Sequence, residues 1–281
     1  MSKYLLHVLS LIALLALTSC ASSSGEKIAP VDSYQLNSGE SVPLPIQYKN
    51  WHWMMAAYSV PVEEVKKMLP EKLIPVPWTP GKAMIAIGVL EYPDVYPLQP
   101  YDEWLVAIPV RYDSTVNLPF LPLVKHPLFE SSLYPDGGAY IVHLPVTTAE
   151  SHRAGSEIWG FPKVHRDIKC REERTMKRCE LLDKGEMVMS LSVEKIKLSK
   201  KSKDFKFCSF TEKEGDLLRT CVKAKGSYDY KVFGKGSLTL GRGGIAKKLS
   251  GLNVDYDEPL QVFRAEISES QLPMAGERFR K

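Results

Sequence analysis

An amine stands in apolar surroundings within residues 156–167, which read SEIWGFPKVHRD. The amine belongs to Lys163, and Trp159 and Phe161 come shortly before it. A free lysine has a pKa of about 10.4, so only about one side chain in 2,500 is neutral and nucleophilic at pH 7. Burial among apolar groups lowers the pKa of a lysine, and the segment therefore indicates a nucleophilic amine. The competing interpretation is an ordinary surface lysine that pairs with a carboxylate.

The residues that lead to Lys163 resemble the signature of the acetoacetate decarboxylase family. In that family the pattern runs Gly-Arg-Glu, a few apolar or small residues, an aromatic residue, Pro and then Lys, and residues 155–163 read GSEIWGFPK. The similarity continues at residues 101–103, which read YDE and precede IPV at 108–110, as in the family's stretch with an active-site glutamate. The resemblance keeps the same order along nearly all of residues 48–279.

The resemblance implies that Lys163 is a Schiff-base lysine and that Glu103 is an active-site carboxylate that moves protons or orients the substrate. In the family, the lysine attacks the ketone of a β-keto acid. The protonated imine then accepts the electron pair that is released as carbon dioxide leaves, with no metal or organic cofactor. We therefore expect a small keto acid or related carbonyl substrate and a decarboxylation. Trp51, Trp159 and Phe161 are expected to line the pocket.

The chain departs from the decarboxylase pattern at four positions. Val164 stands where the decarboxylase has a second lysine, and Ser156 replaces the Arg of Gly-Arg-Glu. Trp51 aligns with an arginine, and Ala86 aligns approximately with another active-site glutamate. The missing second lysine leaves burial to lower the pKa of Lys163, and the missing arginine removes a group suited to a carboxylate.

Because of these departures, other functions stay open. A Schiff-base aldolase or dehydratase would use the same lysine. A relative without catalysis would instead bind a small ligand as a lipoprotein, or would act as a surface structural protein. The substrate itself stays open as well.

The N-terminus reads as an export signal, MSKYLLHVLSLIALLALTSC. Lys3 gives a short positive region, and the apolar stretch over residues 5–17 is shorter than the roughly 20 residues that span a bilayer. Residues 17–20, LTSC, resemble a bacterial lipoprotein signal, which implies cleavage before Cys20 and acyl chains such as palmitate on it. We expect an exported protein that is lipid-anchored to a bacterial membrane, on the periplasmic or the cell-surface side. The alternative is an ordinary cleaved signal with a chance cysteine.

The domain organisation follows from this signal and from composition. Residues 1–19 are expected to be the lipoprotein signal peptide. Residues 20–45 hold the lipidated cysteine and a polar stretch with Ser, Gly and Pro, which is typical of a tether. Residues 46–281 are expected to form one domain of the acetoacetate decarboxylase type.

Four cysteines remain after Cys20, namely Cys170, Cys179, Cys208 and Cys221. Outside the cytoplasm an even number favours disulfides. A turn signal between the last two and the symmetric placement of the first two about another turn favour the pairs 170–179 and 208–221. Four buried free thiols are the alternative. No CxxC pair occurs, and the histidines have no ligand spacing, so no metal is expected.

Most of the chain has the pattern of strands rich in Val, Ile, Leu and aromatic residues. The expected strands are residues 83–92, 104–112, 138–147, 186–198 and 260–267. Pro61 and Pro70 bound one short expected helix at residues 62–68. No helix alternates with the strands, which argues against a parallel sheet. The fold class is therefore α+β, mostly antiparallel β, and the resemblance implies a single β-barrel or cone with a few helices.

Composition and charge narrow the range of partners. The chain of 281 residues is 44% hydrophobic and 25% charged, as in globular proteins, and its net charge is +4. This charge is too small to indicate nucleic acid binding, and no nucleic-acid motif is present. The expected partners are a small carbonyl compound and, through Cys20, a membrane. A homo-oligomer stays open.

Overall fold

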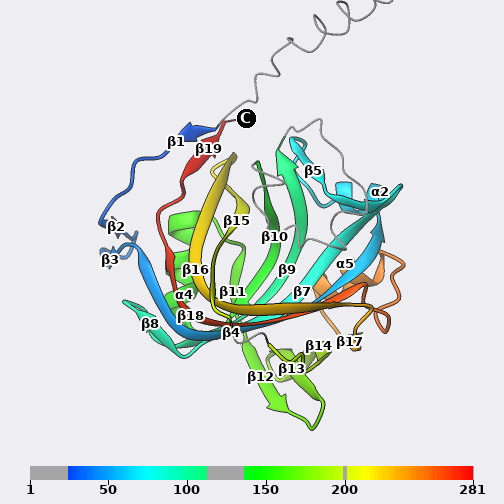
Figure 1. Cartoon of the computed structure of the whole chain (residues 1–281). Coiled ribbons are helices and arrows are strands. Elements are labelled where there is room, and N and C mark those ends of the chain that lie inside the picture. Colours follow the sequence, from blue (N-terminus) through cyan, green and yellow to red (C-terminus); the bar gives the residue numbers. More distant parts are fainter. Residues whose placement is uncertain (1–24, 113–135, 199–200, 281) are drawn as a thin grey trace, which may run out of the picture.

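A closed barrel of seven strands forms the centre of the protein (Figure 1). The computed structural model describes residues 25–112, 136–198 and 201–280. Around the barrel the strand order is β16-β15-β10-β9-β7-β4-β18, and β18 pairs with β16 to close the ring. Neighbouring barrel strands are antiparallel, except for the parallel pair β10 and β15. The barrel strands are β4 (Ile46–Pro61), β7 (Lys82–Tyr92), β9 (Tyr101–Tyr112), β10 (Gly137–Val146), β15 (Lys203–Lys213), β16 (Asp216–Val232) and β18 (Gln261–Leu272).

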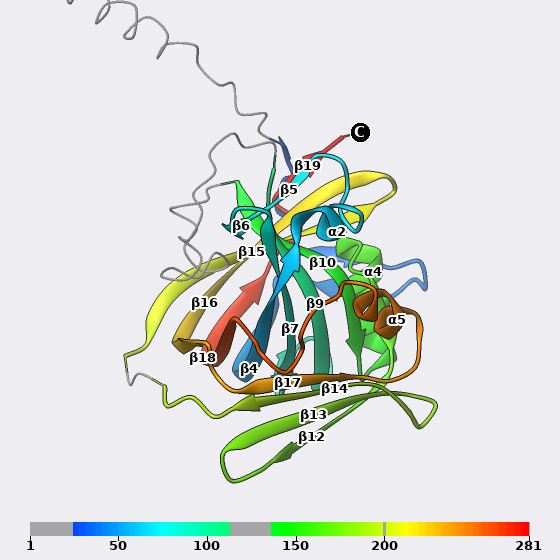
Figure 2. The ribbon, with the colours of Figure 1, turned by 90° about the vertical axis from the view of Figure 1, so that its right-hand side faces the viewer.

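Shorter strands and two further sheets complete the β structure. The strands added to the barrel sheet are β1 (Glu26–Lys27), β5 (Leu73–Pro75), β6 (Pro77–Thr79), β8 (Asp94–Tyr96), β11 (Lys163–His165) and β19 (Glu277–Phe279). A four-stranded sheet lies against the outside of the barrel (Figure 2). Its strands are β12 (Asp167–Glu172), β13 (Met176–Asp183), β14 (Glu186–Glu194) and β17 (Gly236–Leu240). A small hairpin consists of β2 (Ser33–Gln35) and β3 (Ser41–Pro43).

The helices of the described residues are few and short. They are α2 (Val62–Lys66), α4 (Ala149–Trp159) and α5 (Gly244–Ser250). The expected fold class, a mostly antiparallel β domain with a few helices, is confirmed. None of these helices is long and apolar enough to cross a membrane.

The barrel wall next to the four-stranded sheet is buried on both faces. On β9, Leu105 and Ala107 belong to the apolar cluster inside the barrel, whereas Trp104 and Val106 belong to the cluster shared with the outer sheet. Successive side chains of a strand point to opposite faces. A strand with apolar neighbours on both sides therefore reads as a nearly continuous apolar run, as residues 104–110 do.

Several element boundaries differ from those expected. The helix expected at 62–68 ends at Lys66, and a turn follows in which the Met68 N–H donates to the Val65 carbonyl. The strand expected at 186–198 ends at Glu194, because its pairing with β17 stops at Val193. In contrast, β9 starts at Tyr101 rather than at residue 104, and β18 continues to Leu272 because it pairs with β4 along its length.

The folded part begins earlier than the expected boundary at residue 46. The β2–β3 hairpin lies within the expected tether, and Leu36, Val42 and Leu44 from this region are buried in the barrel's apolar cluster. These three apolar side chains connect the polar segment to the barrel. The expected signal peptide at 1–19 and the expected lipidation site at Cys20 lie outside the described residues.

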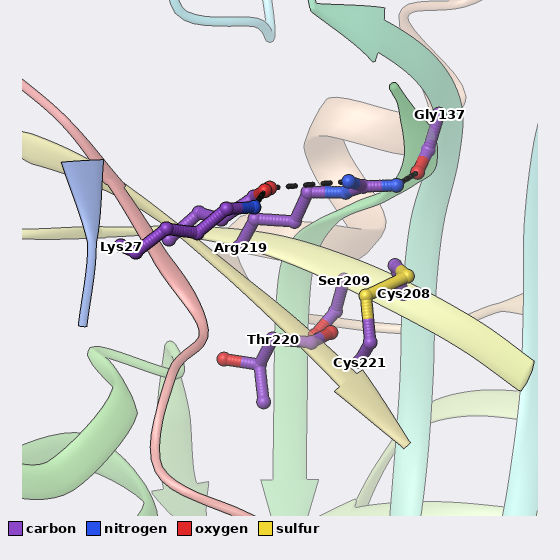
Figure 3. The surroundings of a disulfide bond; sticks show 8 residues. Lys27, Gly137, Cys208, Ser209, Arg219, Thr220 and Cys221 are labelled. Atoms are coloured by element: carbon purple, nitrogen blue, oxygen red, sulfur yellow. Dashed lines mark hydrogen bonds and ion pairs between the residues drawn. A yellow bond between two sulfur atoms is a disulfide. The ribbon is translucent and has the colours of Figure 1, made fainter. Parts of the chain in front are cut away.

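Both expected disulfides are present, so the alternative of free thiols is wrong. Cys170–Cys179 joins β12 to β13, and Cys208–Cys221 joins β15 to β16 (Figure 3). Each pair occupies directly opposite positions in its hairpin, with Cα–Cα distances of 4.1 and 4.0 Å respectively. Local hairpin register therefore explains the pairing.

His143 on β10 should make the fold sensitive to moderate acid. Burial, followed by the charges of Arg166 and Lys248, lowers its pKa from 6.5 to about 4. Between these pH values the unfolded chain binds a proton that the folded chain does not, so stability is lost as the pH falls. The shift corresponds to about 3 kcal/mol. Urea unfolding at pH 7 and at pH 4 should show this loss in the parent and a smaller loss in His143→Gln. Equal losses in both proteins would rule His143 out as the cause.

Candidate active site

Lys163 and Glu103 form a buried ion pair inside the barrel. The distance from Lys163 Nζ to Glu103 Oε2 is 2.9 Å, and both residues are only 8% exposed. Glu103 lies on β9 and Lys163 on β11, and β10 runs between these two strands. Neighbouring strands are about 4.8 Å apart, so the two long side chains meet above β10. The structure thus brings together the two residues that the resemblance assigned to catalysis.

Helix α4 and the turn after it place Lys163. The helix begins with Thr148, whose side chain accepts a hydrogen bond from the Ser151 N–H. It ends at Gly160, which has a positive φ of 66° and donates its N–H to the Gly155 and Ser156 carbonyls. Glycine adopts this left-handed conformation without steric cost because it has no Cβ atom. The chain then reverses and enters β11 at Lys163 itself.

Gly155 of α4 lies directly against the lysine side chain. A Cβ atom at this position would be 2.5 Å from Cδ and 2.6 Å from Cε of Lys163. These distances are shorter than van der Waals contact, so any larger residue would displace the lysine stem. The glycine of the signature therefore leaves room for the amine beside the helix.

A cavity of about 90 Å³ lies inside the barrel, and Lys163 and Glu103 line it. Its wall is mostly apolar, and seven of the nineteen described residues that line it are aromatic. The Lys163 amine lies 5.0 Å from the ring centroid of Tyr101 and 5.8 Å from that of Phe161. Of the residues that the structure describes, only Lys163 and Glu103 contribute charged side chains to the wall.

The three aromatic residues expected in the pocket have different positions. Trp51 and Phe161 line the cavity, and Trp51 Nε1 donates a hydrogen bond to Ser270 Oγ at 2.9 Å. Trp159 does not line the cavity. It is 1% exposed, packs in the apolar cluster and donates from Nε1 to the Pro273 carbonyl at 2.8 Å. The expectation for Trp159 is corrected accordingly: the turn at Gly160 separates its side chain from the cavity.

Three tyrosines of the wall were missed by sequence reasoning. The hydroxyls of Tyr48 and Tyr101 are 3.2 Å apart, and the Tyr92 ring packs against both at 4.6 and 5.0 Å. Burial raises the pKa of each phenol, and the negative charge of Glu103 raises it further, so the phenols stay neutral near pH 7. Strand alternation offered a signal for one of them, because Tyr101 is two residues before Glu103 and faces the same side.

The positions where the sequence departs from the family pattern contribute no charge to the cavity. Trp51 is one of its walls, whereas neither Ala86 nor Val164 lines it. In the part of the chain that the structure describes, no three His, Cys, Asp or Glu side chains are grouped to hold a metal ion. The described wall therefore offers one amine, one carboxylate and neutral hydrogen-bonding groups.

The family of the chain follows from a match to a family model. The model described as acetoacetate decarboxylase (ADC) matches residues 30–262, so the chain belongs to the acetoacetate decarboxylase family. Among curated protein sequences, none matches the chain.

Solved structures show the same fold at low sequence identity. The acetoacetate decarboxylase of Legionella pneumophila has a TM-score of 0.56 at 16% identity, over 83% of this chain and 86% of that one. Another acetoacetate decarboxylase structure has a TM-score of 0.55 at 15% identity, over 84% and 89% of the two chains. The enduracididine biosynthesis enzyme MppR, complexed with pyruvate, has a TM-score of 0.52 at 17% identity, over 90% and 98%. The expected barrel of this family is therefore confirmed.

Proposed function

We propose that the protein is a Schiff-base enzyme in which Lys163 forms an imine with a small carbonyl substrate. The observation that carries this proposal is the pair of Lys163 and Glu103 on the wall of a mostly apolar cavity inside the barrel. A surface lysine in a structural ion pair would have no such space beside it. Membership of the acetoacetate decarboxylase family supports the same assignment.

The geometry supplies the groups that imine chemistry needs. A carbonyl carbon in the cavity has a nucleophile in Lys163. Glu103, at 2.9 Å from the amine, can accept the proton that the amine must lose and return it to the departing oxygen as water. The mostly apolar wall offers few hydrogen-bond partners to water, which would protect the imine from early hydrolysis.

The protonated imine would then assist the cleavage of a neighbouring carbon–carbon bond. Decarboxylation of a β-keto acid is the reaction that the family's name favours. Aldol cleavage passes through the same imine. MppR, which shares the fold, was solved with pyruvate and with the condensation product of pyruvate and imidazole 4-carboxaldehyde. We therefore propose that the protein is a carbon–carbon lyase. Because both reactions pass through the imine, formation of the imine is tested first.

Borohydride trapping tests the imine directly. The protein is incubated with acetoacetate, acetone or pyruvate, and any imine is then reduced with borohydride. The mass of the peptide that contains Lys163 is measured by mass spectrometry. We expect the mass of a reduced adduct on Lys163 in the parent and none in Lys163→Arg, whose guanidinium does not form the imine. Carbon dioxide release from acetoacetate is measured in parallel. A folded parent protein without an adduct from any of the three compounds would refute the proposal and favour a ligand-binding role.

A further inference from the structure

Tyr92 is a polar group of the cavity wall for which imine formation has no use. It lies on β7 opposite Tyr101 of β9 and is 8% exposed. Its ring is fixed between Tyr48, Tyr101 and Trp51. Its hydroxyl makes no hydrogen bond with any residue that the structure describes, although it lines the cavity. Its oxygen is not among the fully buried polar atoms of the described residues, so it is accessible from the cavity and is suited to a ligand atom.

The charges of the wall indicate what kind of atom that is. Lys163 and Glu103 neutralise each other, and they remain balanced when the ammonium becomes an iminium ion. A substrate carboxylate would add a second anion, and the described wall has no further cation to pair with it. Burial of an unpaired charge is far less favourable than burial of a neutral polar group that receives one hydrogen bond. The neutral Tyr92 hydroxyl is therefore suited to donate a hydrogen bond to an uncharged oxygen of the ligand.

We propose that the cavity takes an uncharged carbonyl compound with a second oxygen on its β-carbon, a β-hydroxy ketone or aldehyde, and that Tyr92 donates a hydrogen bond to that oxygen. This inference rests on the proposed imine at Lys163. It makes Tyr92 a substrate-binding residue and makes aldol cleavage, rather than loss of carbon dioxide, the preferred reaction.

The reaction balances with the groups present. The Lys163 ammonium passes a proton to Glu103, and the amine adds to the carbonyl carbon. The proton returns to the carbonyl oxygen, and Glu103 then passes a second proton from the nitrogen to the same oxygen. This oxygen leaves as water, and an iminium ion remains. Glu103 next takes the proton of the β-hydroxyl, an aldehyde leaves, and the electron pair of the broken bond forms an enamine. Glu103 then protonates the enamine carbon. Water hydrolyses the iminium ion and releases a ketone and the Lys163 ammonium.

Three compounds of equal chain length test the inference. They are butan-2-one, its β-hydroxy derivative 4-hydroxybutan-2-one, and acetoacetate. Borohydride trapping is measured against concentration for each compound, and cleavage of the hydroxyketone is followed as acetone and formaldehyde. We expect half-maximal trapping of the hydroxyketone at a concentration about tenfold lower than for butan-2-one, the gain from one hydrogen bond. Acetoacetate should need a higher concentration than the hydroxyketone.

Two variants test whether the preference for the hydroxyketone over butan-2-one depends on the Tyr92 hydroxyl. Tyr92→Phe should abolish the tenfold difference and still trap butan-2-one. Tyr58→Phe removes another buried phenol, which has no described hydrogen-bond partner and lies outside the cavity, and should change nothing. Equal trapping of hydroxyketone and butan-2-one by the parent, or the strongest trapping with acetoacetate, would overturn the inference while the imine stands. No adduct with any compound would overturn the imine itself.

Discussion

Glu103→Gln is expected to lower kcat by about 10²- to 10⁴-fold, the usual contribution of a general acid–base group. The carboxylate lies 2.9 Å from the Lys163 amine and is the only one on the described wall of the cavity. Every proton transfer of an imine reaction therefore has Glu103 as its nearest partner. Glutamine keeps the size and one acceptor oxygen but cannot carry the proton. The measurement is turnover of whichever carbonyl compound traps best on Lys163.

The neighbouring carboxylate provides the matched control. Asp102 precedes Glu103 on β9, is partly buried and does not line the cavity. Asp102→Asn should therefore keep kcat within about twofold, because it alters no group on the cavity wall. Glu103→Gln also leaves the buried ammonium of Lys163 without its counterion, which lowers stability. Both variants are therefore assayed well below their melting temperatures. Full turnover by a folded Glu103→Gln variant would show that Glu103 is not the general acid–base group of the reaction.

The chemistry of the site was more predictable from the sequence than its walls. Lys163 and Glu103 were found because a signature and a second stretch occur in the order of the family. The distance between these two side chains is not predictable from the sequence, since the ion pair depends on β10 running between β9 and β11. The disulfides were predictable for a simpler reason: each joins opposite residues of one hairpin, so only local register matters.

Long-range packing explains what the sequence did not reveal. Trp159 and Phe161 are two residues apart and both precede Lys163. The left-handed conformation of Gly160 turns the chain between them, so only Phe161 reaches the cavity. Likewise, Leu36 and Val42 are isolated apolar residues in a polar stretch. Composition indicated a tether there, and only the barrel surface shows where these two side chains are buried.

Arg219→Met is expected to lower the free energy of unfolding by about 3 kcal/mol, because it breaks a buried ion pair. Arg219 is 8% exposed. Its guanidinium donates to the Gly137 carbonyl at 2.8 Å and to Glu277 Oε2 at 3.1 Å, beside the Cys208–Cys221 disulfide (Figure 3). It thereby ties β16 to β10 and to the C-terminal strand β19. Methionine fills a similar volume but leaves the Glu277 carboxylate with Lys27 as its one cationic partner among the described residues.

The pH dependence separates this ion pair from a general loss of packing. Burial opposes ionisation of Glu277, but the hydrogen bonds from Lys27 and Arg219 outweigh it and lower the pKa. A carboxyl with a lowered pKa contributes stability above its ordinary pKa, and this contribution is lost as the pH falls. The deficit of Arg219→Met should therefore shrink in acid. Arg280→Met, which breaks an exposed pair with Glu26, should change stability by no more than about 0.5 kcal/mol. A deficit in Arg219→Met that stays constant with pH would assign the loss to packing.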